Sequence, residues 1–283
     1  MKRIILSLSI LATLGFSQSK IVEGFSSPES VIIKDKNVYV SNVGAKLEPS
    51  TKDGDGFISL LDKNGEIKNL KFINGLDAPK GMGIVNNTLY IADVDMLKGY
   101  DLGSKKKVFS LVFKNTKFLN DITVKDNKTL FVSSSDANAI YEVNLQKKSY
   151  KKLVDFYAAN GLDYEDGVLY AAELGSSNKT MFDAKGKLYK IKLEDKSLNL
   201  LSSFEGVLDG VQKVGSKVYV SDWVNFKESG IIRVYDTKTK KQSVLGADLF
   251  HGAADFIIDE ETNKLFMPQM IAGKVSIVDL NDK

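Results

Sequence analysis

The stretch "NDITVKDNKTLFVSSS", residues 120–135, contains the pattern that decides the fold. An Asn-Asp pair opens it, an alternating apolar run follows, and a polar turn leads into a second run centred on Phe131. Such alternation in short runs bounded by turn residues is typical of two antiparallel strands. The same form recurs in five more segments: "ESVIIKDKNVYVSNV" (29–43), "KGMGIVNNTLYIADV" (80–94), "NGLDYEDGVLYAAEL" (160–174), "DGVQKVGSKVYVSDW" (209–223) and "DFIIDEETNKLFMPQM" (255–270).

The six segments define a repeat of constant design. Their opening residues are 51, 40, 40, 49 and 46 residues apart, and each segment is followed by a third strand such as "AIYEVNL" or "GIIRVYD". A four-stranded unit of 40–50 residues is the size of a β-propeller blade. We therefore predict an all-β chain forming one six-bladed β-propeller domain over residues 18–283. The segment "SKIVEGF" (19–25) is expected to supply the outer strand of the last blade and close the ring.

Residues 1–17 resemble a secretory signal peptide. Lys2 and Arg3 precede a mostly apolar stretch, and small residues stand before a cut at Gln18. The alternative is a first buried strand. With a signal peptide, the protein is expected to be periplasmic or secreted, and the rest of the sequence contains no apolar segment long enough for a membrane span.

Composition limits the partners. Without Lys2 and Arg3 the formal net charge falls from +3 to about +1, and the charged residues are scattered, so neither nucleic acid nor a membrane surface is an expected partner. The chain has no Cys, which excludes disulfides and thiolate chemistry. We expect a monomer that acts on a small-molecule substrate.

The opening residues of the six repeats are expected to form a ring. The innermost strand of a propeller blade runs beside the central channel, so its first residue faces the axis. These residues are three carboxylates, two amides and one ammonium: Glu29, Lys80, Asn120, Asn160, Asp209 and Asp255. Converging oxygen donors suit Ca²⁺ or another hard divalent cation, while a chain with one His and no Cys disfavours zinc. The alternative is that they are ordinary turn residues. Asp121, one position deeper, is expected to point sideways or downward, in a supporting role, because side chains alternate along a strand.

Four short motifs carry a resemblance to a known family. "SPESV", "LNDITV", "ANGLDY" and "LDGVQ" are similar to the successive metal-ligand segments of the regucalcin/gluconolactonase-like hydrolases, and more distantly to paraoxonases and strictosidine-synthase-like proteins. The resemblance covers the whole chain after the signal peptide and implies a six-bladed propeller with an axial Ca²⁺ or other divalent cation. It implies Glu29, Asn160 and Asp209 as metal ligands, with Asn120 as a further ligand or as the holder of a bound water or substrate oxygen. Asp209 is also the implied general base.

The chain departs from this family at three points. Regucalcin-like members have an Arg that binds sugar acids where this sequence has Phe118, so a gluconolactone-type substrate is not expected. The His pair of paraoxonases cannot exist with only one His. Lys80 adds a cation to the ring that the family does not have.

Three further residues have candidate roles. Lys80 is expected to grip an anionic substrate or stabilise an oxyanion, or else to form a structural ion pair across the channel. His251, four residues before Asp255, is a second candidate for activating water, or an incidental loop residue. Trp223 is expected either at the rim of the site, where it would contact substrate, or as a plug between blades.

Long connections are expected to cover the same rim as the opening residues. They follow the second strand of a blade at residues 44–56, at "GSSNKTMFDAKG" (175–186) and at "WVNFKESG" (223–230), which would bring Met181, Phe182 and Phe226 to the mouth.

Two functions fit these observations. The first is a metal-dependent lactonase or ester hydrolase in which Asp209, or else His251, activates water, while Lys80 and Asp255 contribute to substrate binding. The second is a non-catalytic propeller of the NHL-repeat kind that binds a periplasmic ligand or protein partner and uses the metal for structure. The fold alone does not decide between them.

Overall fold

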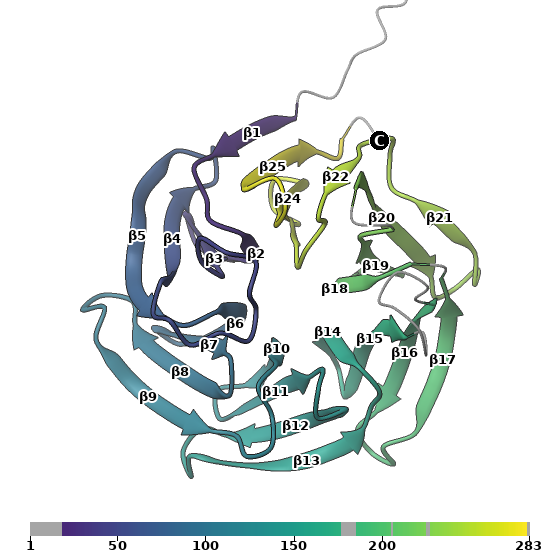
Figure 1. Cartoon of the computed structure of the whole chain (residues 1–283). Coiled ribbons are helices and arrows are strands. Elements are labelled where there is room, and N and C mark those ends of the chain that lie inside the picture. The colour runs from purple at the N-terminus through teal and green to yellow at the C-terminus, as the bar shows by residue number, and fades with distance from the viewer. Residues whose placement is uncertain (1–18, 177–184, 205, 225–226, 282–283) are drawn as a thin grey trace, which may run out of the picture.

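The computed structural model describes residues 19–176, 185–204, 206–224 and 227–281. The predicted signal peptide, Met181, Phe182 and Phe226 therefore lie outside the described residues. The described part is all-β and forms six small antiparallel sheets arranged in a ring around a central axis (Figure 1). The prediction of a six-bladed β-propeller is confirmed.

Each of the first five blades takes four consecutive strands, ordered from the channel outward. The bounds in blades one and two are β2 (Pro28–Lys34), β3 (Asn37–Asn42), β4 (Gly56–Asp62), β5 (Ile67–Leu76), β6 (Pro79–Val85), β7 (Thr88–Asp93), β8 (Met96–Asp101) and β9 (Lys107–Val112). In blades three and four they are β10 (Leu119–Asp126), β11 (Thr129–Ser134), β12 (Ala139–Asn144), β13 (Ser149–Asp155), β14 (Ala159–Glu165), β15 (Val168–Ser176), β16 (Lys185–Lys192) and β17 (Leu198–Ser203). Blade five contains β18 (Leu208–Val214), β19 (Lys217–Asp222), β20 (Glu228–Asp236) and β21 (Gln242–Val244), and the short β22 (Phe250–His251) also pairs with β20.

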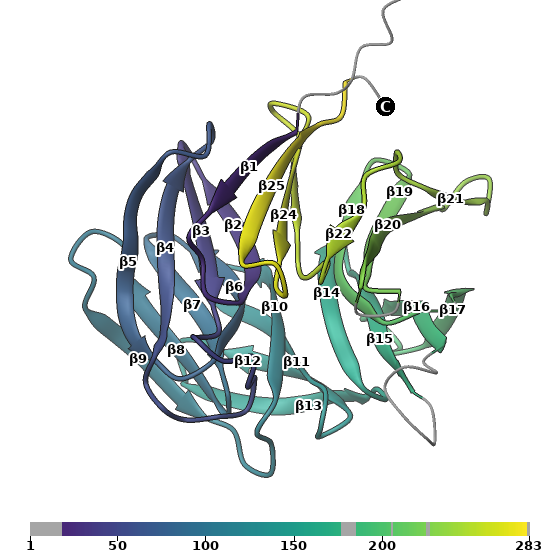
Figure 2. The same ribbon diagram turned by 45° about the horizontal axis from the view of Figure 1, so that its top comes forward.

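The last blade is closed by the N-terminal strand. Blade six takes β23 (Ile257–Asp259), β24 (Lys264–Gln269) and β25 (Lys274–Asp279) from the end of the chain, and β1 (Lys20–Glu23) pairs antiparallel with β25. Figure 2 shows β1 beside β25 at the ring's junction. The predicted closure is therefore confirmed, and the free edge of β25 is covered.

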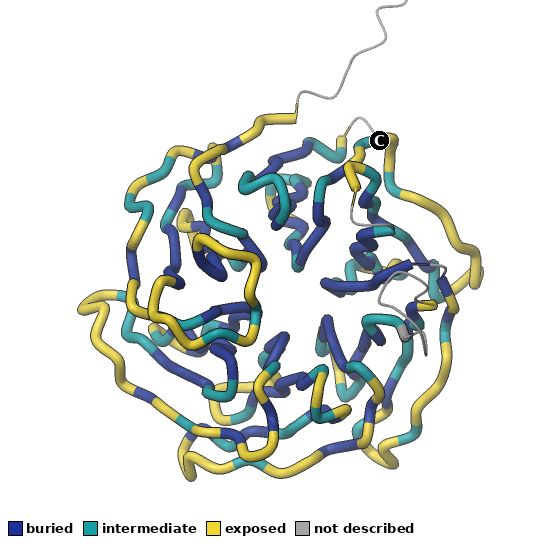
Figure 3. Tube along the Cα trace, viewed as in Figure 1, coloured by how far each residue is buried: buried dark blue, intermediate teal, exposed yellow. Residues whose placement is uncertain are grey.

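The repeated aromatic residue of the second strand packs against the next blade. Tyr39 of blade one lies in an apolar cluster with Met82 of blade two, and Tyr90 of blade two in a cluster with Leu119 of blade three. Equivalent clusters fill the other four interfaces, which accounts for the aromatic at this point of every repeat. The inner strands are buried and the outermost strands are exposed (Figure 3).

The inner strands of blades one to five each begin with a β-bulge. In β2 the pairing with β3 shifts between Pro28 and Val31, so that Glu29 and Ser30 stand in the bulge, and the shift recurs at the equivalent point of β6, β10, β14 and β18. A bulge re-aims side chains relative to the regular alternation of a strand.

Among the described residues there is no helix long and apolar enough to cross a membrane.

Candidate functional site

Five of the six predicted opening residues line one cavity at the mouth of the channel, the end at which the inner strands begin. The cavity has a volume of about 300 Å³. Its polar residues each come from the bulge of a different inner strand, and all are buried: Glu29, Lys80, Asn120, Asn160 and Asp209. Its apolar wall contains Leu47, Pro49, Phe118, Leu174, Val207, Trp223 and Met270. We call these twelve residues the mouth cavity.

The sixth opening residue was assigned one position out of register. In blades one to five the opening residue stands three positions before the residue that pairs with the repeated aromatic, as Glu29 does before Ile32. In blade six Ile257 pairs with Phe266, so this position is Ala254 and not Asp255. The turn between β23 and β24 contains four residues, two more than the corresponding turns of the other blades. Blade three instead accommodates its additional residue in a second bulge before Asp126.

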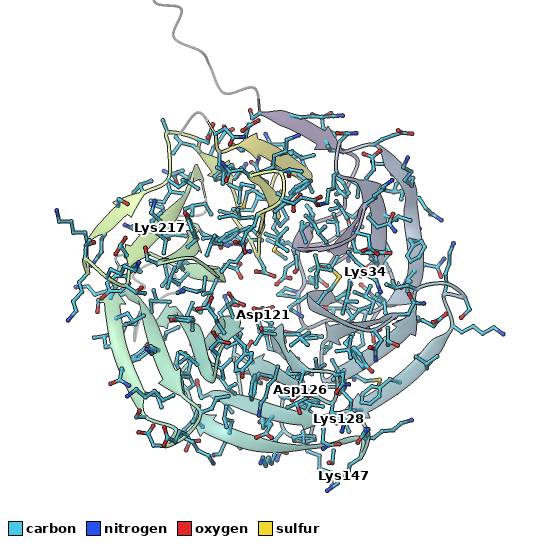
Figure 4. The ribbon with its side chains drawn as sticks, turned by 180° about the vertical axis from the view of Figure 1, so that it is seen from behind. Lys34, Asp121, Asp126, Lys128, Lys147 and Lys217 are labelled. Atoms are coloured by element: carbon cyan, nitrogen blue, oxygen red, sulfur yellow. The ribbon has the colours of Figure 1, made fainter. Side chains whose placement is uncertain are left out.

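Asp255 accordingly faces the opposite end of the channel. It lines a second cavity of about 170 Å³ together with Asp121, Asp163 and Gln212, and its Oδ2 accepts a hydrogen bond from Ser30 Oγ at 2.6 Å. Asp121 lies near the centre of the ring when the molecule is seen from behind (Figure 4). Asp121 therefore points into the channel too, at the end away from the mouth cavity.

The other two predicted site residues differ in their placement. His251 lies in β22, where its backbone N–H donates to Gln269 Oε1 at 2.8 Å, and it does not line the mouth cavity. Trp223 does line it, and its Nε1 donates to Asp209 Oδ2 at 2.9 Å. The indole also packs among apolar residues of the rim such as Ala254 and Met270, so it is both a wall of the cavity and a packing element.

The connection between β3 and β4 covers part of the mouth. Leu47 and Pro49 of this segment line the mouth cavity, as expected for a long connection after the second strand of a blade. Leu174, in the last part of β15, lines it from blade four.

Close approach of the inner strands explains the glycines next to the ring. A Cβ on Gly161 would stand 2.1 Å from the backbone oxygen of Asp209, and a Cβ on Gly81 would stand 2.5 Å from the Cα of Asp121. Any side chain would push neighbouring inner strands apart at these positions. The glycines that follow Lys80 and Asn160 thus allow the inner strands, and the polar side chains beside them, to lie close to one another.

Two oxygen atoms of the mouth cavity are buried without a hydrogen-bond partner among the described residues. They are Oε2 of Glu29 and Oδ1 of Asn160. The Nδ2 of Asn160 donates to the Leu208 backbone oxygen at 2.9 Å, which fixes the orientation of the amide. The amide of Asn120 is fixed in the same way, because its Nδ2 donates to Ser135 Oγ at 3.0 Å. Buried polar atoms are rarely left unpaired, so these two oxygens indicate a ligand site.

Burial raises the pKa of both carboxylates of the cavity. Burial and the neighbouring Asp209 and Asp255 raise the pKa of Glu29 well above its ordinary value. Burial raises the pKa of Asp209 to about 7, although hydrogen bonds from Trp223 and Asn160 oppose the shift. A bound cation would remove this penalty by stabilising the ionised forms.

Lys80 is buried in the cavity and forms no ion pair with any described residue. Its Nζ donates to the Ala78 backbone oxygen at 3.0 Å and lies 4.9 Å from the centroid of the Phe118 ring. No carboxylate of the described residues lies within 4.0 Å of this Nζ, so the expected structural ion pair across the channel is not formed. Burial lowers the pKa of Lys80 to about 8, opposed by the negative charges of Glu29, Asp93 and Asp136. Phe118 and Lys80, two of the positions at which the sequence differs from the regucalcin-like pattern, are thus in contact.

Sequence reasoning missed a second polar ring that supports the first. Three residues after the repeated aromatic, each second strand carries a polar side chain: Asn42, Asp93, Ser134, Glu173, Asp222 and Gln269. Asp93 accepts hydrogen bonds from the backbone N–H of Asp77 and Ala78, and Asp222 accepts one from Val207. These bonds hold the segments that lead into the inner strands. The constant spacing after the aromatic was the sequence signal that could have identified them.

The donor set of the mouth cavity fits a hard divalent cation. Within the described ranges, no group of three or more His, Cys, Asp or Glu side chains is placed to hold a metal. A cation here would instead use two carboxylates and the amide oxygens of Asn160 and Asn120, and two of these groups present the unpaired buried oxygens. Mixed carboxylate and carbonyl oxygens are the ligands that Ca²⁺ prefers.

Comparison with known proteins supports the fold. No protein-family model matches the chain. The chain is similar to Antigen Lp49 of Leptospira interrogans, with 26% identity over 176 residues, which is 60% of this chain and 37% of that protein. The crystal structure of the Nidogen/Laminin Complex contains a chain that matches with a TM-score of 0.57 and 11% identity, over 92% of this chain and 93% of that chain. The protein is therefore a six-bladed β-propeller with a remote sequence relative in Lp49.

Proposed function

We propose that the protein is a divalent-cation-dependent hydrolase of lactones or esters, with its active site in the mouth cavity. The single observation that carries the proposal is the pair of unpaired buried oxygens, Glu29 Oε2 and Asn160 Oδ1, on the floor of a cavity of about 300 Å³. Such atoms cost free energy unless a ligand satisfies them. The family resemblance of the four short motifs points to the same residues.

Glu29, Asn160 and Asp209 would hold the cation, with Asn120 as a fourth oxygen donor. The proposed cation is Ca²⁺, because all four side chains offer hard oxygen atoms and none offers sulfur or nitrogen. When bound, such an ion polarises a carbonyl and lowers the pKa of water.

The chain's own residues supply orientation and proton transfer. Asp209 is the candidate general base, since it lines the cavity, and His251 does not. The hydrogen bond from Trp223 Nε1 to Asp209 Oδ2 orients this carboxylate. The apolar wall packs against the body of the substrate and excludes bulk water.

The test is hydrolysis of a panel of lactones and aryl esters by the calcium-loaded protein. Asp209→Asn should lower the rate by about 10²–10⁴-fold, because the amide cannot accept a proton. Asp163→Asn is the matched control: it makes the same chemical change at the far end of the channel, and the rate should stay unchanged.

Three outcomes separate the alternatives. Loss of hydrolysis in Asp209→Asn, with retained activity in Asp163→Asn, supports the proposal. Calcium binding without turnover of any substrate would leave a non-catalytic propeller with a structural cation. Unchanged thermal unfolding on addition of calcium and then a chelator would show that the ring binds no such ion.

A further inference from the structure

Blade two contains two buried lysines, Lys80 and Lys98, which differ in the negative charges that surround them. Lys98 is 9% exposed and lies 2.5 Å from Asp93 Oδ2 and 3.3 Å from Asp77 Oδ2. Lys80 is 1% exposed, and among the described residues its ammonium group has one hydrogen-bond acceptor, the Ala78 backbone oxygen, and lies over the face of the Phe118 ring. Lys98 is therefore neutralised by two neighbouring carboxylates, whereas no carboxylate of the described residues forms an ion pair with Lys80. An ammonium held in this way retains donors for a ligand.

The surroundings of Lys80 combine one cation with a largely apolar wall. Among the described residues that line the mouth cavity, Lys80 is the only cationic side chain. The wall residues Leu174, Val207 and Met270 offer aliphatic surface, and Phe118 and Trp223 offer aromatic surface. A ligand complementary to this cavity has one anionic group and an apolar body.

The charge of the ligand follows from the charges in the cavity, and this step rests on the proposed function. Glu29 and Asp209 contribute two negative charges, Lys80 contributes one positive charge, and the divalent cation contributes two. The loaded cavity thus has a net charge of +1. An isolated charge in a water-poor site is costly, and one negative charge on the ligand would neutralise it.

We propose that the mouth cavity binds an organic monocarboxylate, with its carboxylate on the Lys80 ammonium and its apolar part against the Trp223 side of the wall. A phosphate monoester carries about −1.5 to −2 charges at neutral pH and would over-compensate the cavity. A single lysine also lacks the several donors with which arginine clusters bind phosphate. The substrate class of the proposed hydrolase is accordingly a lactone or ester that bears a separate carboxylate.

The experiment uses the fluorescence of Trp223. It is the only tryptophan of the chain, so intrinsic tryptophan fluorescence reports on the mouth cavity alone. The calcium-loaded full-length protein is titrated with hexanoate and, separately, with hexanamide, which has the same size without the charge. Hexanoate should bind about tenfold or more tightly, because truncating one side of a buried charge pair costs at least this factor.

Variants of Lys80 test whether the preference for hexanoate over hexanamide depends on the positive charge of this side chain. Lys80→Met should remove the preference, so that hexanoate binds no more tightly than hexanamide, whereas Lys80→Arg should keep the preference. Lys213→Met is the control, since Lys213 lies in the inner strand of blade five with its Nζ on Glu165, away from the mouth cavity. Far-UV circular dichroism and thermal unfolding confirm that each variant is folded.

The outcomes distinguish this inference from the proposed function. Equal binding of hexanoate and hexanamide, or an undiminished preference in Lys80→Met, overturns the inference even where calcium binding and hydrolysis are intact. Absence of calcium binding by the wild type overturns the proposed function and, with it, the charge count. If hexanoate is preferred in a Lys80-dependent manner but no substrate is hydrolysed, the proposed ligand class is supported and only the proposed catalytic activity is overturned.

Discussion

The two ends of the central channel both contain buried carboxylate and amide side chains, but the two ends differ in how far the oxygen atoms of these groups are hydrogen-bonded. At the far end Asp121 accepts hydrogen bonds from the backbone N–H of Ile122 and of Leu162, and Asp163 accepts one from Lys213, each at 2.6–2.7 Å. These bonds join blade three to blade four and blade four to blade five. At the mouth, Glu29 and Asn160 each keep a buried oxygen without a partner among the described residues. Polar residues on a propeller axis therefore do not by themselves mark a ligand site; their unsatisfied atoms do.

The largest effect expected from this comparison is on stability at the far end. Asp121→Ala removes the acceptor of two buried backbone N–H groups, one of which lies in the next blade. We expect a loss of about 2–4 kcal/mol in the free energy of unfolding, measured by urea denaturation. Glu260→Ala, which removes an exposed carboxylate from a turn of blade six, is the control and should change stability by less than about 0.5 kcal/mol. Equal stability of the two variants would show that the far end is not structural.

The second effect concerns cation binding at the mouth. Calcium at a hundredfold excess over its dissociation constant should stabilise the wild type by about 2.7 kcal/mol, because only the folded chain brings the four oxygen donors together. Differential scanning calorimetry should show the gain in the wild type and in Asp163→Asn, and should show none in Glu29→Gln. A gain that is lost in Asp163→Asn and kept in Glu29→Gln would place the cation at the far end instead.

The third effect is a pH dependence at the far end. Burial raises the pKa of Asp163 to about 6, although the backbone N–H groups of Lys213 and Tyr164 oppose the shift. Since the folded chain binds this proton more tightly than the unfolded chain, Asp163 stabilises the fold below about pH 4, and this contribution is lost as pH rises to about 6. The free energy of unfolding of Asp163→Asn relative to wild type should therefore increase by about 1–2 kcal/mol between pH 4 and pH 6. A pH-independent difference would contradict the raised pKa.

The smallest expected effect is the change in the free energy of unfolding caused by Glu29→Gln when no cation is bound. Glu29→Gln removes a buried group whose charged form is disfavoured, and it breaks no hydrogen bond of Oε2 among the described residues. In the presence of a chelator the variant should be within about 1 kcal/mol of the wild type, or more stable, at pH 8. A large destabilisation would show that Glu29 has a structural role like that of Asp121.

Much of the fold was predictable because each blade of the propeller corresponds to one copy of a repeat in the sequence. Alternation, turn residues and the aromatic of the second strand recur in each copy, and each follows from packing between neighbouring strands and blades. The closing strand β1 was predictable for the same reason, since a free edge on the last blade needs a partner. The positions of Glu29, Lys80, Asn120, Asn160 and Asp209 followed from their common place at the start of the inner strand.

The sequence by itself thus determined six blades, their closure and the five polar residues at the mouth. Tertiary structure alone decided that Asp255 faces the far end, because counting residues cannot tell whether an additional residue lengthens a turn or enters a bulge. It also decided that Lys80 lies over Phe118 on the next blade and forms no ion pair with a residue that the structure describes. Hydrogen-bond satisfaction is a property of all neighbours at once, and those neighbours come from blades that are distant in the sequence.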